Sequence, residues 1–331
     1  MIARKKFALS LSVLLAGTAA IVFGATLLWR AKLSAGTTGD FVEYAMTLDS
    51  DIPTAVAAGP DDTIWFTIGF ADAVGMIRDG RLQRLPKAKK NVEPVGLAVD
   101  AQGAAWFADP TEVQISRIVP SGAIQSFSLQ TPIARLGRLA IAPDGAVWFA
   151  ESTGYGFTRL KDGVLTRNVP KSVRGGPYGV AVDAHGVVWG TLQGGNSLVK
   201  IAPGQPIAEY EIPTPGSSPS DVAVDASGNP WFIEFRGNKV GKFSEGKFSE
   251  YPVPGEWSGL SGIAVTPDGA VWFGMLRGHA IGRLRDGQFK IFELPRSQAR
   301  PYTVAADTHG NIWYADISGF VGMLKASAAS R

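Results

Sequence analysis

Acidic residues follow four of the chain's tryptophans at one fixed distance, three residues further on. They are Asp109, Glu151, Glu234 and Asp316. Carboxylates that converge hold hard cations such as Mg²⁺ or Ca²⁺, so these four acids are candidate metal ligands. Carboxylates also bond backbone amides and pair with arginines, and the loops of the same face carry Arg135, Arg138, Arg174, Arg236, Arg277 and Arg300. Because spacing alone does not show convergence, the sequence favours such pairing over a metal site.

The three histidines fall at two kinds of position. His185 and His309 each stand four residues before a tryptophan, inside Asp-x-His-Gly turns where we expect solvated side chains. His279 stands seven residues after Trp272, in a loop on the opposite face. Histidine is the commonest general base, so His279 is the candidate catalytic residue, with a structural role as the alternative.

A further set of residues varies although its spacing does not. Eleven residues before the regularly spaced tryptophans stand Thr54, Val95, Gly137, Tyr178, Ser220, Ser261 and Tyr302. Where the spacing is constant but the residue type varies, a binding site on a repeated scaffold is typical. Loops of successive repeats converge at one end of the scaffold and form the mouth of such a site. The sequence therefore predicts a mouth for a small-molecule, glycan or peptide ligand. Its predicted residues are Tyr178, Ser220, Ser261, Tyr302, Arg138, Arg277 and Arg300.

The tryptophans define the elements that must position these side chains. Trp65, Trp106, Trp148, Trp189, Trp231, Trp272 and Trp313 are separated by 41, 42, 41, 42, 41 and 41 residues. A period near 40 that carries short strands is typical of a β-propeller. The clearest repeat predicts strands at 222–224, 230–233, 238–243 and 247–253, which gives seven blades of four strands. We expect most of the tryptophans to pack between blades as core.

The two ends of the repeat array predict how the ring closes. Residues 41–48 resemble the fourth strand of a blade, and the chain stops after a third strand at 319–324. The first segment would therefore complete the seventh blade and leave no open sheet edge. This predicts an all-β propeller over residues 40–325 and a short polar tail over 326–331. We expect a monomer.

The N-terminus is a separate segment. Basic residues at 4–6 precede an uncharged run at 7–29, which is long enough to cross a bilayer as a helix. The run exceeds the ~7–15 apolar residues of an ordinary signal peptide, so residues 1–32 are predicted to be a signal anchor, followed by a linker at 33–39. The flanking charges place the propeller in the periplasm or outside the cell, tethered to the membrane. Secretion after signal cleavage is the alternative.

Charge and composition exclude several classes of function. The formal net charge is +3, but without the basic residues at 4, 5, 6, 30 and 32 the count is 27 basic against 29 acidic, a net of −2. No basic stripe remains, so we expect no nucleic-acid partner. The absence of cysteine excludes disulfides, thiol catalysis and Cys-based zinc sites.

The repeat resembles that of a known enzyme family. Residues 262–273 read Gly-Ile-Ala-Val-Thr-Pro-Asp-Gly-Ala-Val-Trp-Phe, and Ile-Gly-Arg-Leu follows at 281–284. Trp-Phe-Ile-Glu at 231–234, followed by Asn-Lys-Val-Gly at 238–241, is a second match. Over all seven blades the pattern resembles the streptogramin B lyase (virginiamycin B lyase) family. The resemblance implies a propeller that opens the ester of a cyclic depsipeptide by elimination, with Mg²⁺ as cofactor.

The resemblance also implies where the catalytic groups lie. The family has histidines at the start of the first strand in its last two blades, an acid two residues before the second histidine, and a glutamate four residues after the last tryptophan. In this chain these positions are Ser261, Tyr302, Arg300 and Ile317. Elimination next to a carbonyl needs a base, a cation and an acid, and none of these four side chains is an obvious replacement.

Three functions therefore remain open. The first is ligand binding at the mouth without lyase activity, which the four replaced positions favour. The second is an Mg²⁺-dependent C–O lyase of the same family with relocated catalytic groups, for which His279 is the candidate base. The third is a metal-dependent hydrolase like the lactonases, which would need several carboxylates to converge in the channel.

Overall fold

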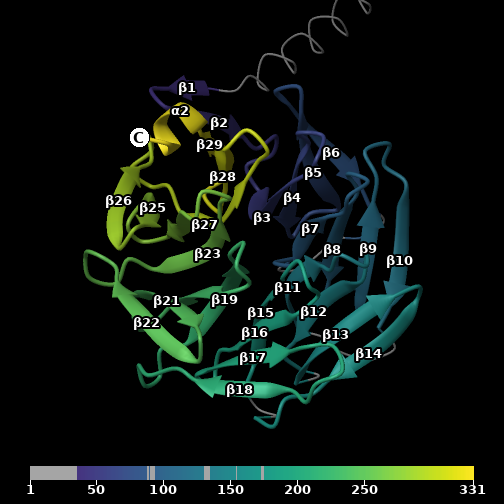
Figure 1. The fold of residues 1–331 in the computed structure, drawn as a ribbon. Helices are drawn as coiled ribbons and strands as arrows, with labels where there is room; N and C mark the ends of the chain where they lie inside the picture. Colours follow the sequence, from purple (N-terminus) through teal and green to yellow (C-terminus); the bar gives the residue numbers. More distant parts are fainter. Residues whose placement is uncertain (1–35, 88, 90–93, 130–134, 154, 173–174) are drawn as a thin grey trace, which may run out of the picture.

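Seven antiparallel sheets are arranged in a ring, and neighbours in sequence are neighbours in the ring (Figure 1). The computed structural model describes residues 36–331 except 88, 90–93, 130–134, 154 and 173–174. Within these residues six sheets have four strands and one has five. The predicted seven-bladed β-propeller is therefore confirmed.

Blades one to six each take four consecutive strands. Blades one and two hold β3 (Ile52–Ala58), β4 (Ile64–Gly69), β5 (Ala73–Arg78), β6 (Arg81–Pro86), β7 (Leu97–Val99), β8 (Ala105–Asp109), β9 (Gln114–Ile118) and β10 (Ile124–Ser128). Blades three and four hold β11 (Leu136–Ile141), β12 (Val147–Glu151), β13 (Gly156–Lys161), β14 (Val164–Asn168), β15 (Pro177–Val182), β16 (Val188–Leu192), β17 (Ser197–Ile201) and β18 (Ala208–Glu211). Blades five and six hold β19 (Pro219–Val224), β20 (Pro230–Glu234), β21 (Lys239–Ser244), β22 (Lys247–Pro252), β23 (Leu260–Val265), β24 (Val271–Met275), β25 (Ala280–Arg285) and β26 (Gln288–Glu293).

Blade seven joins the two ends of the chain. Its strands are β27 (Pro301–Ala306), β28 (Ile312–Asp316), β29 (Phe320–Leu324), β2 (Phe41–Ala45) and β1 (Gly36–Thr38). β2 pairs with β29 from Phe41 opposite Leu324 to Ala45 opposite Phe320, so the N-terminal strand closes the ring as predicted. The closing strand ends at Ala45, however, which is shorter than the expected segment 41–48.

Two short segments differ from the sequence expectation. Residues 36–38, predicted as part of a linker, form β1 on the outer edge of β2. The predicted polar tail contains a helical turn, α2 (Ala326–Ala329), whose Ala328 and Ala329 are buried in the core of the closing blade. Burial of these two small apolar side chains favours the turn over a free tail.

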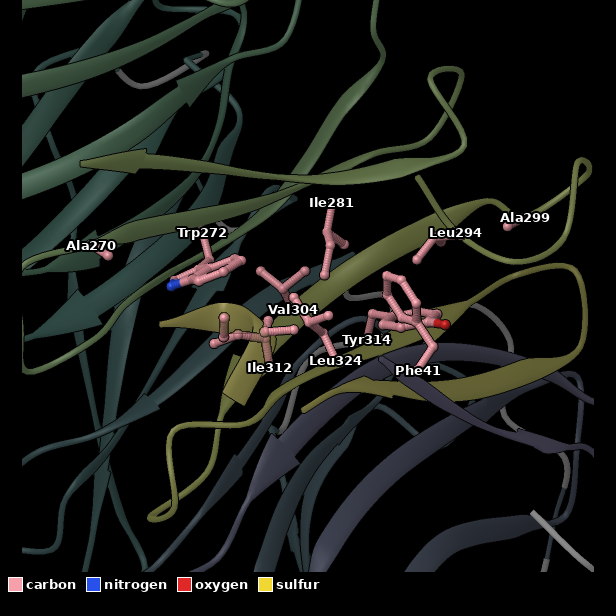
Figure 2. Packing of buried hydrophobic residues seen from close by; sticks show 12 residues of the cluster. Phe41, Ala270, Trp272, Ile281, Leu294, Ala299, Val304, Ile312, Tyr314 and Leu324 are labelled. Atoms are coloured by element: carbon pink, nitrogen blue, oxygen red, sulfur yellow. The ribbon is translucent and has the colours of Figure 1, made fainter. Parts of the chain in front are cut away.

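The tryptophans pack between blades, as expected. Trp272 of blade six shares one buried cluster with Val304, Ile312 and Tyr314 of blade seven and Phe41 of the closing strand, and it lies at the end near Val304 and Ile312 (Figure 2). Several of the indoles also bond the turn between the first two strands. Trp106, Trp231 and Trp313 each donate an indole N–H to the aspartate six residues earlier, at 3.0, 3.1 and 2.8 Å. The same residue type thus fills the space between blades and fixes a turn.

The predicted membrane segment at 7–29 lies outside the described residues, as does the rest of the chain before residue 36. Across the part of the chain that the structure describes, no helix is both long enough and apolar enough to cross a bilayer.

Candidate functional site

A cavity of about 360 Å³ lies where loops of blades three to seven converge. It lies on the face that carries the loops before each first strand and between each second and third strand, here called the mouth face. Five of the seven residues predicted to form a ligand mouth line this cavity: Tyr178, Ser220, Ser261, Tyr302 and Arg138. Gln193, Phe235, Leu260 and Leu276 complete most of the remaining wall, together with Gly259 and Gly262. The volume is in the range of sites for small ligands.

A larger hollow, of about 830 Å³, lies among the turns of blades two to four on the opposite face. Its acids already have partners. Asp100 accepts hydrogen bonds from the Trp106 indole and the Arg117 guanidinium, and Asp183 accepts two backbone N–H groups of its own turn. These side chains hold turns together, so the smaller cavity on the mouth face is the candidate site.

Irregular strand pairing aims side chains into this cavity. The register between first and second strands shifts in blade one and in blades three to seven, after Pro53, Leu136, Pro177, Pro219, Ser261 and Pro301. The residues released from the ladder include Arg138, Tyr178, Ser220 and Tyr302, all of which line the cavity. A bulge bends a strand and redirects a side chain, and bulges are common beside binding sites.

Close packing of the first strands fixes this arrangement. At Gly137 an added Cβ would come within 2.3 Å of the carbonyl oxygen of Tyr178. Only glycine permits the two strands to approach so closely. The strand that carries Arg138 therefore lies directly against the strand that carries Tyr178.

Arg138 lies at the bottom of the site and is buried. Its Nε is 3.1 Å from Oδ2 of Asp221, and its Nη1 donates to the Val95 carbonyl at 2.9 Å. The rings of Tyr178 and Tyr302 lie 5.7 and 5.5 Å from the guanidinium carbon, within the range of cation–π attraction. Their hydroxyl oxygens are 3.0 Å apart. The base of the cavity is therefore a neutralised ion pair between two aromatic rings.

Burial controls the protonation of this cluster. It raises the pKa of Asp221, and the positive charge of Arg138 opposes that rise. Burial likewise raises the pKa of Tyr178 above its ordinary value, so this phenol stays neutral at physiological pH. Tyr178 therefore supplies no phenolate base near neutral pH.

One hydroxyl in the cavity wall is available to a ligand. Oγ of Ser220 is buried and has no hydrogen-bond partner among the described residues. Ser261 differs, because its hydroxyl donates to the Pro301 carbonyl at 2.7 Å. A buried polar atom without a partner costs free energy, which a ligand that accepts or donates a hydrogen bond there would recover.

His279 lies in an exposed loop and is not among the residues that line the cavity. Its φ is 51°, and Nδ1 lies 2.7 Å from the Ala299 carbonyl, which can only accept, so the ring donates there. Asn196 and Asn238 stand at the same blade position with φ of 51° and 50°. Their side-chain amides donate to backbone carbonyls of the corresponding loops at 3.0 and 3.1 Å. His279 therefore takes the place of a loop-anchoring asparagine.

The four candidate metal ligands lie in four different blades and do not converge. Asp109 accepts from Lys87 Nζ at 3.1 Å and from the Glu112 backbone N–H at 3.1 Å. Glu151 pairs with Arg167 at 2.8 Å. Within the described ranges, no group of three or more His, Asp or Glu side chains could hold a metal ion.

Asp316 is the most completely bonded of the four acids. It is fully buried and pairs with Arg296. It also accepts the backbone N–H groups of Arg300 and Ser318, at 2.9 and 2.8 Å. These bonds satisfy both carboxylate oxygens and tie the second strand of blade seven to the loop before its first strand.

Glu234 is also fully buried, but neither of its carboxylate oxygens has a hydrogen-bond partner among the described residues. Burial, with repulsion from Glu250, raises the pKa of Glu234 to about 7, and Lys239 opposes the rise. Lys239 is itself bound to Glu250 at 2.8 Å and to the Thr214 hydroxyl at 2.6 Å. Glu234 points between blades, not into the cavity.

The remaining predicted mouth residues, Arg277 and Arg300, are exposed on the mouth face and do not line the cavity. Their guanidinium groups have no ion pair or hydrogen bond with described residues. Arg174 lies outside the described residues. Sequence reasoning missed Asp221, although a lone charge at the start of an apolar strand is a signal that a partner is needed. It also missed Gln193 and Phe235, for which no local pattern gives a signal.

Known proteins match both the sequence and the fold. The model of the virginiamycin B lyase family matches residues 28–161 and 134–329. A curated virginiamycin B lyase from Nocardia farcinica is 30% identical over 190 residues, which cover 57% of this chain and 65% of that relative. The structure of a catalytically inactive virginiamycin B lyase from Staphylococcus aureus with quinupristin is similar with a TM-score of 0.81 at 23% identity, covering 86% of this chain and 98% of that one. A streptogramin B lyase structure gives 0.81 at 22% identity, over 86% and 96% of the two chains.

Proposed function

This chain belongs to the virginiamycin B lyase family, and we propose that it is a binding member of that family. In this proposal the cavity above Arg138 takes a small molecule, or the end of a glycan or peptide, and does not catalyse elimination. The alignment spans less than two thirds of the curated relative, so the activity of that relative is not carried over to this chain.

The composition of the cavity wall carries the proposal. The residues that line it include no histidine, aspartate or glutamate. Elimination requires a group that removes a proton next to a carbonyl, and a general base must reach that proton directly or through one water. The pKa values of Arg138 and Tyr178 are both raised, so these groups stay protonated near neutral pH and can bind and orient a ligand but cannot serve as its base.

The Mg²⁺ that the family resemblance implies does not fit this donor set. At the four positions that the resemblance assigns to catalysis stand Ser261, Tyr302, Arg300 and Ile317. Mg²⁺ is held through carboxylate and other oxygen ligands, whereas Arg300 is a cation and Ile317 has no donor atom. The hydroxyl of Ser261 is already bonded to a backbone carbonyl. These four positions therefore offer no ligand set for Mg²⁺.

The proposal includes export and membrane attachment. The uncharged run at 7–29 and the basic residues before it support a retained signal anchor, with the propeller in the periplasm or outside the cell. Intact-mass measurement of the protein purified from membranes tests this. A mature chain that begins after residue 29, recovered in the soluble fraction, would show cleavage and release instead.

A turnover assay separates binding from catalysis. The full chain in detergent is incubated with a streptogramin B and Mg²⁺, and the products are analysed by mass spectrometry. We expect the antibiotic to remain intact. A linear product of unchanged mass would identify a lyase and overturn the proposal, and a product heavier by one water would identify a hydrolase.

A cavity-blocking variant tests where a ligand binds. Ser220→Phe places a large ring in the cavity wall, and Leu276→Trp blocks it from a loop. We expect both variants to lose the thermal shift that a bound ligand gives to the wild type, whereas Ser220→Ala should keep most of it. Retention of the full shift in both blocked variants would place binding elsewhere.

A further inference from the structure

An exposed tryptophan stands beside the cavity in a backbone conformation that disfavours it. Trp257 has a φ of 51°, in the left-handed region that is sterically unfavourable for a large side chain. Its surface is 59% exposed, so packing does not compensate for this conformation. Gly259, two residues further on, lines the cavity. Strained residues of this kind are typical of functional sites.

The preceding blade shows what this turn requires. Gly216 holds the same blade position, fifteen residues before the tryptophan of its blade, with a φ of 62°. No atom lies within 4 Å of the place where a Cβ of Gly216 would be, so the position opens to solvent. Glycine takes this conformation without strain. The fold therefore does not need a tryptophan at this position.

The loop that carries Trp257 is firmly held. Oδ1 of Asn238 accepts the backbone N–H of Ser258 at 3.1 Å, and the Ser258 carbonyl accepts the N–H of Arg277 at 3.1 Å. The loop before blade five has the same two bonds. Oδ1 of Asn196 accepts the backbone N–H of Ser217 at 2.8 Å, and the Ser217 carbonyl accepts the N–H of Arg236 at 2.9 Å. Because the residue next to Trp257 is bonded on two sides, the backbone that carries the indole is held at a defined place. Such preorganisation lowers the cost of binding a ligand.

The charge around this loop is positive. Arg236, Arg277 and Arg300 are exposed on the mouth face in blades five, six and seven, and their guanidinium groups have no partner among the described residues. One exposed acid, Glu256, stands next to Trp257. Because the chain without its N-terminal basic residues has a net charge of −2, this excess of arginine is a local feature.

Arg277 packs against the cavity wall from outside. Its Cγ lies 3.1 Å from the place of a Cβ on Gly259, which lines the cavity. Phe235, also part of the wall, is 37% exposed. Phe235 in the wall, Arg277 packed against Gly259, and Trp257 two residues before Gly259 therefore mark this edge of the cavity, in blade five and blade six.

We propose that Trp257 and Arg277 form an outer subsite that selects small aromatic ligands bearing an acidic group. The inference rests on the proposed binding function. The indole of Trp257 stacks on the ring of the ligand, and the guanidinium of Arg277 pairs with its acid through charge-assisted hydrogen bonds. Asp221 already neutralises the positive charge of Arg138, so Arg277 provides the selection for a negatively charged ligand.

Three probes test the proposed chemistry on the full chain in detergent. Indole-3-acetate has the ring and the charge, indole-3-acetamide has the ring alone, and cyclohexylacetate has the charge without an aromatic ring. Binding is measured by isothermal titration calorimetry. We expect indole-3-acetate to bind at least fivefold more tightly than either of the others. Equal affinities, or no binding of indole-3-acetate, would overturn the assigned ligand class.

Trp257→Gly recreates the turn of the preceding blade and tests the role of the indole. We expect the affinity for indole-3-acetate to fall at least fivefold while the melting temperature stays equal or rises, since the backbone strain is relieved. Phe70→Gly is the matched control, because Phe70 is also exposed and left-handed, with a φ of 60°, but lies in blade one. It should leave the affinity unchanged.

Arg277→Gln tests the role of charge. We expect the affinity for indole-3-acetate to fall to that of the amide, and the affinity for the amide to stay unchanged. Wild-type affinity in both the Trp257 and Arg277 variants would overturn the subsite.

The cavity-blocking variants separate this failure from failure of the proposed function. Loss of binding in Ser220→Phe and Leu276→Trp, with no effect of Trp257→Gly, would reject the outer subsite and leave the binding cavity in place. Full binding in both blocked variants would reject the cavity itself, and with it the subsite on its edge.

Discussion

Blades five and seven place two acids in the same arrangement and stabilise them in different ways. In blade seven Asp316 ends the second strand and Glu43 lies on the fourth, and in blade five Glu234 and Glu250 hold the equivalent positions. Arg296 bridges the acids of blade seven, with Nε 3.1 Å from Glu43. The position of Arg296, seventeen residues before the tryptophan, is Thr214 in blade five.

The difference shows that a blade position does not determine an environment. Thr214 donates to Glu250 at 2.9 Å but carries no charge, and Lys239 reaches Glu250 at 2.8 Å. Glu234 is then left buried with unbonded oxygens. The residue type at this loop position therefore separates an acid that pairs with an arginine from a buried acid whose pKa is raised to about 7.

Loss of Arg296 should have the largest effect. Arg296→Met leaves two largely buried carboxylates of blade seven without their cation and removes a link between the closing strand β2 and the body of the blade. Breaking a buried ion pair typically costs about 3–5 kcal/mol, so we expect a loss of that size in the free energy of unfolding, measured with urea at pH 7.

The matched change in blade five is Lys239→Met. Glu250 keeps its bonds to the hydroxyl and backbone N–H of Thr214, so the cost should be only about 1 kcal/mol. If the two variants lost equal stability, the contrast between a bridged and an unbridged acid pair would be wrong.

Glu234→Gln should change the pH dependence of stability. The pKa of Glu234 in the folded chain is about 7, raised by burial and by Glu250 and opposed by Lys239, against 4.5 for the free group. The folded chain therefore holds a proton that the unfolded chain releases between pH 4.5 and 7, and stability falls as pH rises through this window. At about 1.4 kcal/mol per pH unit, ionised Glu234 costs roughly 3 kcal/mol above pH 7.

The glutamine cannot ionise, so the variant should match the wild type at pH 4 and exceed it at pH 8 by up to that amount. Urea unfolding of both proteins at pH 4, 6 and 8 measures the difference. A constant difference across the range would show that Glu234 does not titrate there.

Introducing the bridging arginine into blade five should have a smaller effect on the free energy of unfolding. Thr214→Arg places in blade five the residue type that joins the acids of blade seven. We expect a gain of about 1 kcal/mol at pH 8 and a weaker fall in stability between pH 4.5 and 7, because the new cation favours ionised Glu234. The same urea series measures it, and an unchanged pH profile would mean that the arginine does not reach Glu234.

The architecture could be predicted from the sequence because the tryptophan period reports the repeat directly. The repeat pattern also predicted the closing strand, since a fourth strand precedes the first blade and is missing from the last. The predictions were less accurate at the ends, where the expected tail forms α2, because short apolar residues such as Ala328 gain burial only against a blade that the sequence pattern does not place.

The candidate site could be predicted only in part, because counting from the tryptophans gives strand positions but not side-chain directions. Side chains alternate along a strand, so Glu234 shares a face with Phe232 and lies between blades rather than toward the channel. The same holds for the other acids three residues after a tryptophan. Conversely, Arg138 and Ser220, which counting from the tryptophans predicted at the mouth, do reach the cavity because the strand pairing shifts beside them.

We expect the smallest change in stability at His279 of blade six, which differs from Asn238 of blade five in residue type but holds its loop in the same way. His279 replaces the asparagine that holds the loop at position 238, and its ring donates to Ala299 as the amide of Asn238 donates to Val253. Both residues take the left-handed conformation, which asparagine tolerates well.

His279→Asn should therefore change the free energy of unfolding by less than about 0.5 kcal/mol. It should also leave ligand affinity and any turnover of a streptogramin B unchanged between pH 5 and 8. A loss of turnover with unchanged stability would identify His279 as a catalytic base, and would mean that the mouth face rearranges to bring this loop over the cavity.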